Sequence, residues 1–173
     1  MTNPKHKQQD LFFEGSLEKK IDRMNILYQN YGSQLLADSS VMTALARIKQ
    51  YCAALSDHMA AMDLGTLCTK CAQTSNGGCC SRYMEANSDV ILLLINRLQR
   101  PEAIQLQHDR AAECRLLGER GCTLAVKPMF CLNYNCKHIS DKATGPEMTR
   151  LEQLAGQLLT EQTRLEELIL ERL

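Results

Sequence analysis

The chain carries no excess of charge of either sign, and this absence excludes several classes of protein. Twenty lysines and arginines balance twenty aspartates and glutamates among 173 residues. Proteins that bind nucleic acid or a charged membrane surface usually carry a basic excess. We therefore expect neither nucleic acid nor a lipid surface among the partners of this protein.

Long apolar stretches are also missing. The longest run, residues 90–95, is six residues long, whereas a membrane span needs roughly eighteen or more. The first fifteen residues are polar and contain no apolar segment of signal-peptide length. These absences predict a cytoplasmic protein that does not associate with a membrane.

Recognisable catalytic motifs are absent as well. The sequence contains no phosphate-binding loop, no dinucleotide-binding fingerprint and no Ser/His/Asp order typical of a hydrolase. We assign no catalytic residue. The sequence leaves open whether the protein is an enzyme, and a redox accessory protein is the interpretation that fits these absences best.

Cysteine, in contrast, is abundant, with nine residues in the chain. In a reducing cytoplasm, clustered cysteines more often bind metal than form disulfides, and an odd number would leave one thiol unpaired. Cys52 falls on the apolar seam of a predicted helix, so we interpret it as a core residue. The other eight cysteines are the candidate metal ligands: Cys68, Cys71, Cys79, Cys80, Cys114, Cys122, Cys131 and Cys136.

The periodicity of the apolar residues predicts a mainly α fold, a bundle of three long helices plus a shorter one with an irregular, cysteine-rich metal-binding lobe. Residues 1–15 lack periodicity and are expected to form a flexible lead, followed by a single domain over 16–173. Apolar residues at alternating spacings of three and four predict two helices, which begin after Ser16 and after Asp38. Because the linker is short, we expect them to form an antiparallel hairpin over 16–64.

The remainder of the chain is predicted to hold the metal-binding lobe and the third long helix. Within the lobe, 65–145, the apolar run at 89–98 could be a buried strand, but the capping residues before it favour a short helix. The final helix, 146–173, begins with Pro146 at a position where helices tolerate proline. We expect it to pack on the hairpin; the alternative is that it pairs two copies of the chain as a homodimer.

The first group of cysteines has features typical of metal sites. Cys68 and Cys71 form a CxxC knuckle, the commonest element of tetrahedral thiolate sites. The Gly77–Gly78 pair allows backbone amides to approach sulfur closely. Adjacent side chains in extended backbone point to opposite sides, so the neighbours Cys79 and Cys80 favour two metal centres, or a larger cluster, over one small ion.

The second group of cysteines contains no second CxxC knuckle, which a pair of zinc-ribbon sites would show. The tight cysteine run of bacterial ferredoxins is missing too. Eight thiols nevertheless divide into two sites of four thiolates each. Because the two groups lie far apart in the sequence, we expect at least one site to use cysteines from both.

Taken together, the order and spacing of these cysteines resemble a known family. Two glycines precede Cys79–Cys80, a glycine precedes Cys122, and a Pro128-x2-Cys131 step follows. Over 68–136 this pattern is similar to the YkgJ-type cysteine-cluster family, described as a zinc- or iron-chelating domain with a CxxCxxCC signature. The gap before Cys79–Cys80 is longer than in that family. The resemblance implies metal or iron–sulfur binding and implies no particular reaction.

The leading hypothesis is a small iron–sulfur protein that holds one or two clusters, of the [4Fe–4S] type, through these eight cysteines. Its role would be to transfer electrons, or to supply clusters, to a partner protein. The alternative is a protein-interaction module stabilised by Zn²⁺ and without redox chemistry, because both metals accept four thiolates.

Other polar residues near the cysteines have two interpretations. His138 could replace a thiolate, but eight cysteines make this unnecessary, and we interpret it as an exposed loop residue. The basic residues are either solvated surface or charge compensation for an anionic metal centre, and they are Lys70, Arg82, Arg115, Arg120, Lys127 and Lys137.

Overall fold

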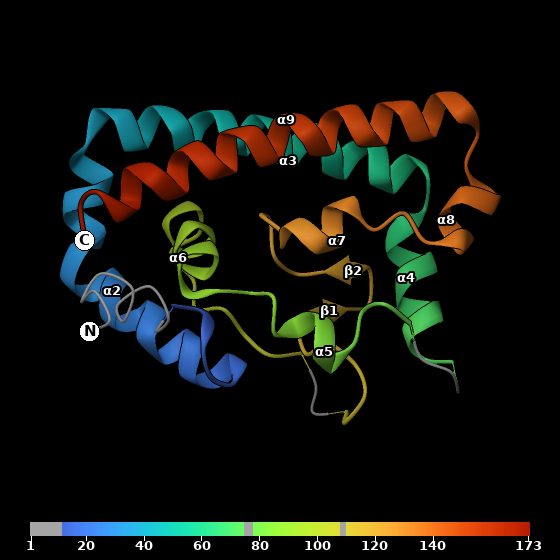
Figure 1. The fold of residues 1–173 in the computed structure, drawn as a ribbon, viewed down its shortest axis with the longest axis horizontal. Coiled ribbons are helices and arrows are strands. Elements are labelled where there is room, and N and C mark those ends of the chain that lie inside the picture. The colour runs from blue at the N-terminus through green and yellow to red at the C-terminus, as the bar shows by residue number, and fades with distance from the viewer. Residues whose placement is uncertain (1–11, 75–77, 108–109) are drawn as a thin grey trace, which may run out of the picture.

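The protein is mainly helical, as the sequence predicted, with three long helices, several short ones and one small hairpin (Figure 1). A computed structural model describes residues 12–74, 78–107 and 110–173. Most of the predicted flexible lead and Gly77 of the glycine pair therefore lie outside the described residues. The elements are α2 (Leu17–Ala37), α3 (Ser39–Ala61), α4 (Leu64–Ala72), α5 (Arg82–Glu85), α6 (Val90–Gln99), β1 (Leu117–Gly118), β2 (Gly121–Cys122), α7 (Met129–Asn133), α8 (Lys137–Lys142) and α9 (Gly145–Leu170).

The long helices begin where their capping residues predicted. Ser16 caps α2, and its hydroxyl accepts a hydrogen bond from the backbone of Lys19. The Asp38 carboxylate caps α3 by accepting from two backbone amides, at 2.8 and 3.0 Å. Thr144 and Glu147 form a reciprocal capping box at the start of α9. Each cap satisfies backbone donors that the first helical turn leaves unpaired.

The expected hairpin of the first two long helices is not what the structure contains. Helix α3 packs along α9, and α2 packs along α6, whereas α2 and α3 contact each other far less (Figure 1). Only Asp38 separates α2 from α3. One residue is too short to turn the chain back on itself, since hairpins of helices need about two to five. The partner of α3 is therefore the distant C-terminal helix.

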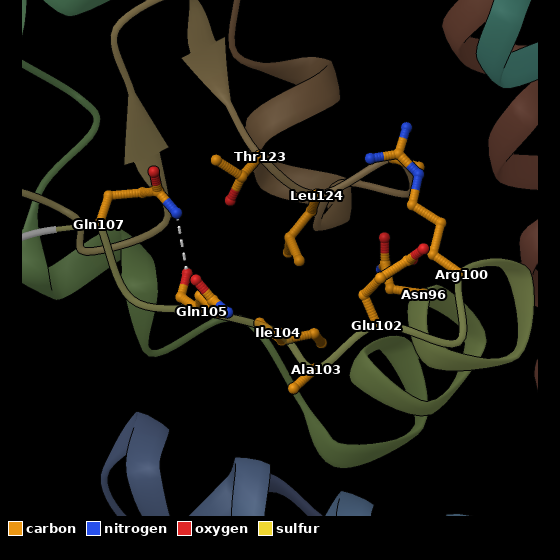
Figure 2. Close-up of a pocket in the computed structure, with 10 residues that line it drawn as sticks. Asn96, Arg100, Glu102, Ala103, Ile104, Gln105, Gln107, Thr123 and Leu124 are labelled. Atoms are coloured by element: carbon orange, nitrogen blue, oxygen red, sulfur yellow. Dashed lines mark hydrogen bonds between the residues drawn. The ribbon is translucent and has the colours of Figure 1, made fainter.

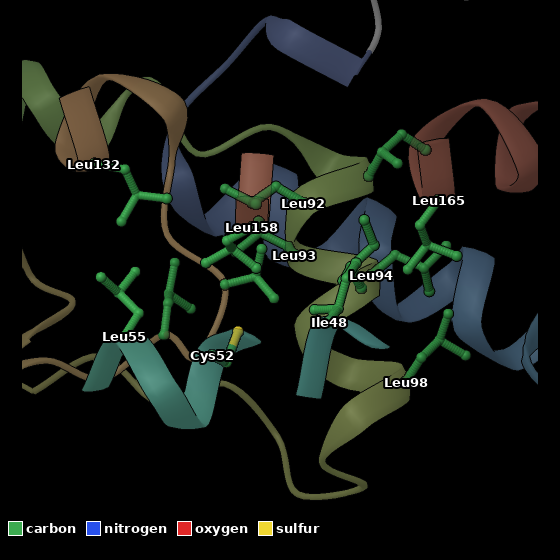
Figure 3. Packing of buried hydrophobic residues seen from close by; sticks show 14 of the residues in the cluster. Ile48, Cys52, Leu55, Leu92, Leu93, Leu94, Leu98, Leu132, Leu158 and Leu165 are labelled. Atoms are coloured by element: carbon green, nitrogen blue, oxygen red, sulfur yellow. The ribbon is translucent and has the colours of Figure 1, made fainter. Parts of the chain in front are cut away.

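Helix α6 occupies the centre of the fold. Its six-residue apolar run forms a helix, as predicted. The sequence favoured Asn87 or Ser88 as the capping residue, whereas the cap is the next residue, Asp89. The side chains on all faces of this run are buried, as is typical of a helix that is apolar all round. Figure 3 shows its leucines facing residues of α3 and α9, including Cys52, which is 7% exposed in the core as predicted.

The cysteine-rich lobe contains more regular structure than the sequence predicted. The expected loop after Gly65 is instead helix α4, and Cys68 and Cys71 both lie on it. Short helices also form at α7, which contains Cys131, and at α8, which begins directly after Cys136. The lobe's two-residue strands pair antiparallel, with Leu117 opposite Cys122. These elements are too short for periodicity to reveal.

Within the described ranges, every helix is either too short or too polar to cross a membrane.

Candidate thiol site

Five of the eight candidate cysteines line one cavity of about 80 Å³ that is partly open to the surface. They come from both cysteine groups of the sequence, as expected for at least one site. Leucine and methionine side chains and one lysine, Lys127, form much of the remaining wall. The five cysteines are Cys68 of α4, Cys80, Cys114, Cys122 of β2 and Cys131 of α7.

Backbone pairing brings the two cysteine groups together. The segment after the glycine pair runs antiparallel to the segment before β1, with a bridge between Ser81 and Glu113. The Cys114 amide donates to the Cys80 carbonyl at 3.1 Å. The Arg82 amide donates to the Ala112 carbonyl of the same segment at 3.0 Å. Thiols 34 positions apart in the sequence thus come to line one wall.

A buried ion-pair network fixes this pairing to the helices. Arg115, 5% exposed, donates from Nη2 to Glu85 Oε1 at 2.7 Å, and its backbone amide donates to the same carboxylate at 2.7 Å. Its guanidinium also pairs with Glu18 of α2, which lowers the pKa of that carboxyl to about 2. Arg115 therefore does not lie on solvated surface, and two carboxylates balance most of its charge, although that charge still acts to lower the pKa of the neighbouring Cys114.

A second buried group positions Lys127. The Asn96 amide, on α6, donates to the Val126 carbonyl at 2.9 Å and accepts from the Val126 amide at 3.0 Å. This two-way bond holds the segment before α7 against the central helix. Lys127 consequently lies beside the thiols. Burial raises the pKa of Cys122, and the positive charge of Lys127 opposes this increase; the same charge adds to the lowering of the pKa of Cys68.

The thiols differ in how readily they ionise. A hydrogen bond from the Cys80 thiol lowers the pKa of Cys79 to about 6 and also lowers the pKa of Cys68, whereas the pKa of Cys80 itself is raised. Burial raises the pKa of Cys114 to about 11 and that of Cys131 to about 12. A bound cation would reverse these increases, since metal ligation deprotonates a thiol.

Three of the predicted ligands do not line the cavity: Cys71, Cys79 and Cys136. Cys71 lies where Gly78 passes close to it, because a Cβ on that glycine would sit 3.0 Å from the Cys71 sulfur. The close backbone approach expected of the glycine pair is thus present at Gly78. Of the two adjacent cysteines, only Cys80 lines the cavity, but their thiols are hydrogen-bonded to each other, so the side chains do not diverge as the sequence predicted.

The chemistry of the cavity fits a thiolate-bound metal centre, but its present geometry is not a coordination sphere. All nine cysteines are free thiols. A single tetrahedral zinc, with Zn–S bonds of 2.3 Å, needs sulfur atoms about 3.8 Å apart. Among the described residues, no three side chains of His, Cys, Asp or Glu are grouped closely enough to hold a metal ion. Binding therefore requires the thiols to move together; a change of χ1 rotamer moves a cysteine sulfur by about 3 Å.

Another depression is lined by polar side chains and by no cysteine. Figure 2 shows a depression of about 270 Å³ between the end of α6 and the segment after β2. Asn96, Arg100 and Glu102 line it beside glutamine and threonine side chains, and it contains no cysteine. Its residues follow no sequence motif, so the sequence offered no signal for it.

Comparisons of the chain with models of protein families, with curated proteins and with solved structures found no match. The resemblance to the YkgJ-type family therefore remains a prediction.

Proposed function

We propose that this protein binds an iron–sulfur cluster through the cysteines of the cavity and serves in one-electron transfer or cluster supply in a reducing compartment such as the cytoplasm. The observation that carries the proposal is that one largely apolar cavity is lined by five cysteines: Cys68, Cys80, Cys114, Cys122 and Cys131. Four thiolates suffice for a [4Fe–4S] cluster, so five cysteines provide a complete ligand set.

The surroundings of the cavity support a redox centre. Apolar walls and burial limit solvent access, and the charge near a cluster tunes its reduction potential. Lys127 lines the cavity and would partly offset the negative charge of a thiolate-ligated cluster. The protein supplies ligands, a dry environment and this cation, while the cluster supplies the redox chemistry.

The spacing of the metal ligands distinguishes the cluster from zinc. A cluster divides its thiolates among several iron atoms, so each sulfur need not contact one central ion, as it must in a zinc site. This difference favours the cluster for the described thiols, which line one cavity without surrounding a single point. Zinc, which would make the protein an interaction module without redox chemistry, is the competing outcome of the experiment.

The experiment is anaerobic purification, followed by metal analysis and spectroscopy. We expect a brown protein that contains iron and acid-labile sulfide, with broad absorbance near ~400 nm that dithionite bleaches. Electron paramagnetic resonance of the reduced protein would identify the cluster type. A colourless protein with stoichiometric zinc would refute the proposal, and so would a protein that stays metal-free after anaerobic reconstitution with iron and sulfide.

A further inference from the structure

A shallow depression on the surface lies directly outside the thiol cavity. It has a volume of about 260 Å³ and is formed by the end of α3, the start of α4 and the β1–β2 hairpin. Cavity and depression share five lining residues: Met59, Gly65, Gly121, Cys122 and Lys127. Cys122 is thus reachable from the cavity on one side and from the depression on the other.

Two glycines make the wall between them thin. A Cβ on Gly65 would lie 2.3 Å from the Arg120 carbonyl oxygen, and one on Gly121 would lie 3.1 Å from the Cα of Gly65. Gly121 also has a φ of +102°, a conformation that favours glycine. Backbone therefore packs directly on backbone here, with no side chain between.

The depression is positively charged. Arg120 and Lys127 line it, and neither forms an ion pair within the described part of the chain. Asp63 is its one acidic lining residue, and that carboxylate pairs with Lys142 at 3.4 Å. Glu119, next to Arg120 in the chain, does not line this depression but lines an adjoining one, which shares Arg120, Gly121 and Cys122 with it. The local field therefore attracts anionic surfaces, although the whole chain is neutral.

We propose that this depression is the docking site of an acidic electron-carrier protein. The inference rests on the proposed function and extends it by naming the partner's chemistry and its place of contact. Carboxylates on the carrier would face Arg120 and Lys127, which places the carrier's redox centre opposite Cys122. One electron then passes from the carrier, which is oxidised, to the cluster, which is reduced, and no bond forms or breaks.

The test measures reduction of the cluster-loaded protein by a reduced, acidic [2Fe–2S] ferredoxin in stopped-flow experiments. For Arg120→Glu we expect the second-order rate constant at low salt to fall about tenfold, and the difference from wild type to shrink as salt screens the charges. The matched control is Arg164→Glu, which makes the same change of charge at an exposed position in the C-terminal half of α9. It should change the rate less than about twofold. Reduction by dithionite should be the same in all three proteins.

Three results would overturn the docking site. They are an equal loss of rate in both variants, a wild-type rate that is independent of salt, and a change in dithionite reduction in Arg120→Glu. Titration calorimetry of oxidised ferredoxin into protein without cofactor separates this inference from the proposed function. If no cluster ever loads, weaker binding by Arg120→Glu alone keeps the docking site while the proposed function fails. If a cluster loads and ferredoxin does not bind, the docking site fails alone.

Discussion

Cys122 occupies the most informative single position, because it lines both the cavity and the surface depression. If Cys122 is a ligand, Cys122→Ser should lower metal affinity by more than about tenfold. Losing a residue that only hydrogen-bonds to a ligand already costs about that much, and losing the ligand itself should cost more. Metal analysis after anaerobic reconstitution measures the effect.

Cys52→Ser is the matched control for that substitution. Cys52 is buried in the core, and its thiol donates to the Ala125 carbonyl at 3.4 Å. Serine can keep the hydrogen bond but buries a more polar group, so we expect a cost of about 1–3 kcal/mol in unfolding free energy with full metal content. Loss of metal in both variants would indicate a general effect on folding and contradict the ligand assignment.

The ion-pair network of Arg115 allows a second comparison at the residue scale. Glu85→Ala leaves the buried guanidinium without its buried carboxylate partner, so we expect a loss of about 3–5 kcal/mol in unfolding free energy. Glu18 has a side chain that is 51% exposed, and Glu18→Ala should cost less than about 1 kcal/mol. Urea unfolding of both variants measures the difference. Equal losses in unfolding free energy would show that the burial of Glu85 does not make its contact with Arg115 stronger than that of Glu18.

At the scale of elements, the packing of α4 against β2 decides whether Cys68 and Cys122 line the same cavity. Gly65→Ala would place a methyl group 2.3 Å from a backbone oxygen of the hairpin. The two elements must then separate. We expect a lower melting temperature, by several degrees, and reduced cofactor loading.

Gly156→Ala, in the middle of α9, is the control for that change. Apart from the neighbouring backbone of its own helix, no atom of the described residues lies within 4 Å of the Cβ that it would add, so the gain in helix propensity should stabilise the protein by about 0.5–1 kcal/mol. Circular dichroism melting curves of both variants check the contrast. A Gly65→Ala protein that melts and loads cofactor like wild type would refute the close packing of α4 on the hairpin.

At the scale of the whole molecule, the apolar face of α9 is already covered. Its apolar spacing predicts a seam of seven residues, of which Met148 and Leu168 are half-buried. The helix packs largely against α3 within the same chain, and the other five residues are buried: Leu151, Leu154, Leu158, Leu165 and Ile169. A homodimer through this helix would have to replace those contacts. We therefore expect a monomer of 19.5 kDa in light scattering coupled to size-exclusion chromatography. A dimer of twice that mass would contradict the observed packing if Leu158→Glu dissociated it without unfolding the protein.

Local features of the chain could be predicted because neighbouring residues alone determine them. Ser16, Asp38 and Pro146 marked the starts of helices, and the spacing of apolar residues placed Cys52 in the core. The short helices α4, α7 and α8 were missed because elements of one or two turns carry too little periodicity. Their formation depends instead on contacts with the rest of the fold.

The sequence by itself determined a helical protein with eight candidate thiols outside the core, since helix caps, heptad spacing and residue type are local properties. Only the tertiary structure decided that α3 pairs with α9, that Arg115 is buried between Glu18 and Glu85, and which five cysteines face one cavity. The first two join residues at least thirty positions apart, and the cavity combines cysteines from two groups that are 34 positions apart at their nearest lining members, Cys80 and Cys114. Such contacts depend on how the elements pack against one another, and this packing cannot be read from the spacing of residues along the chain.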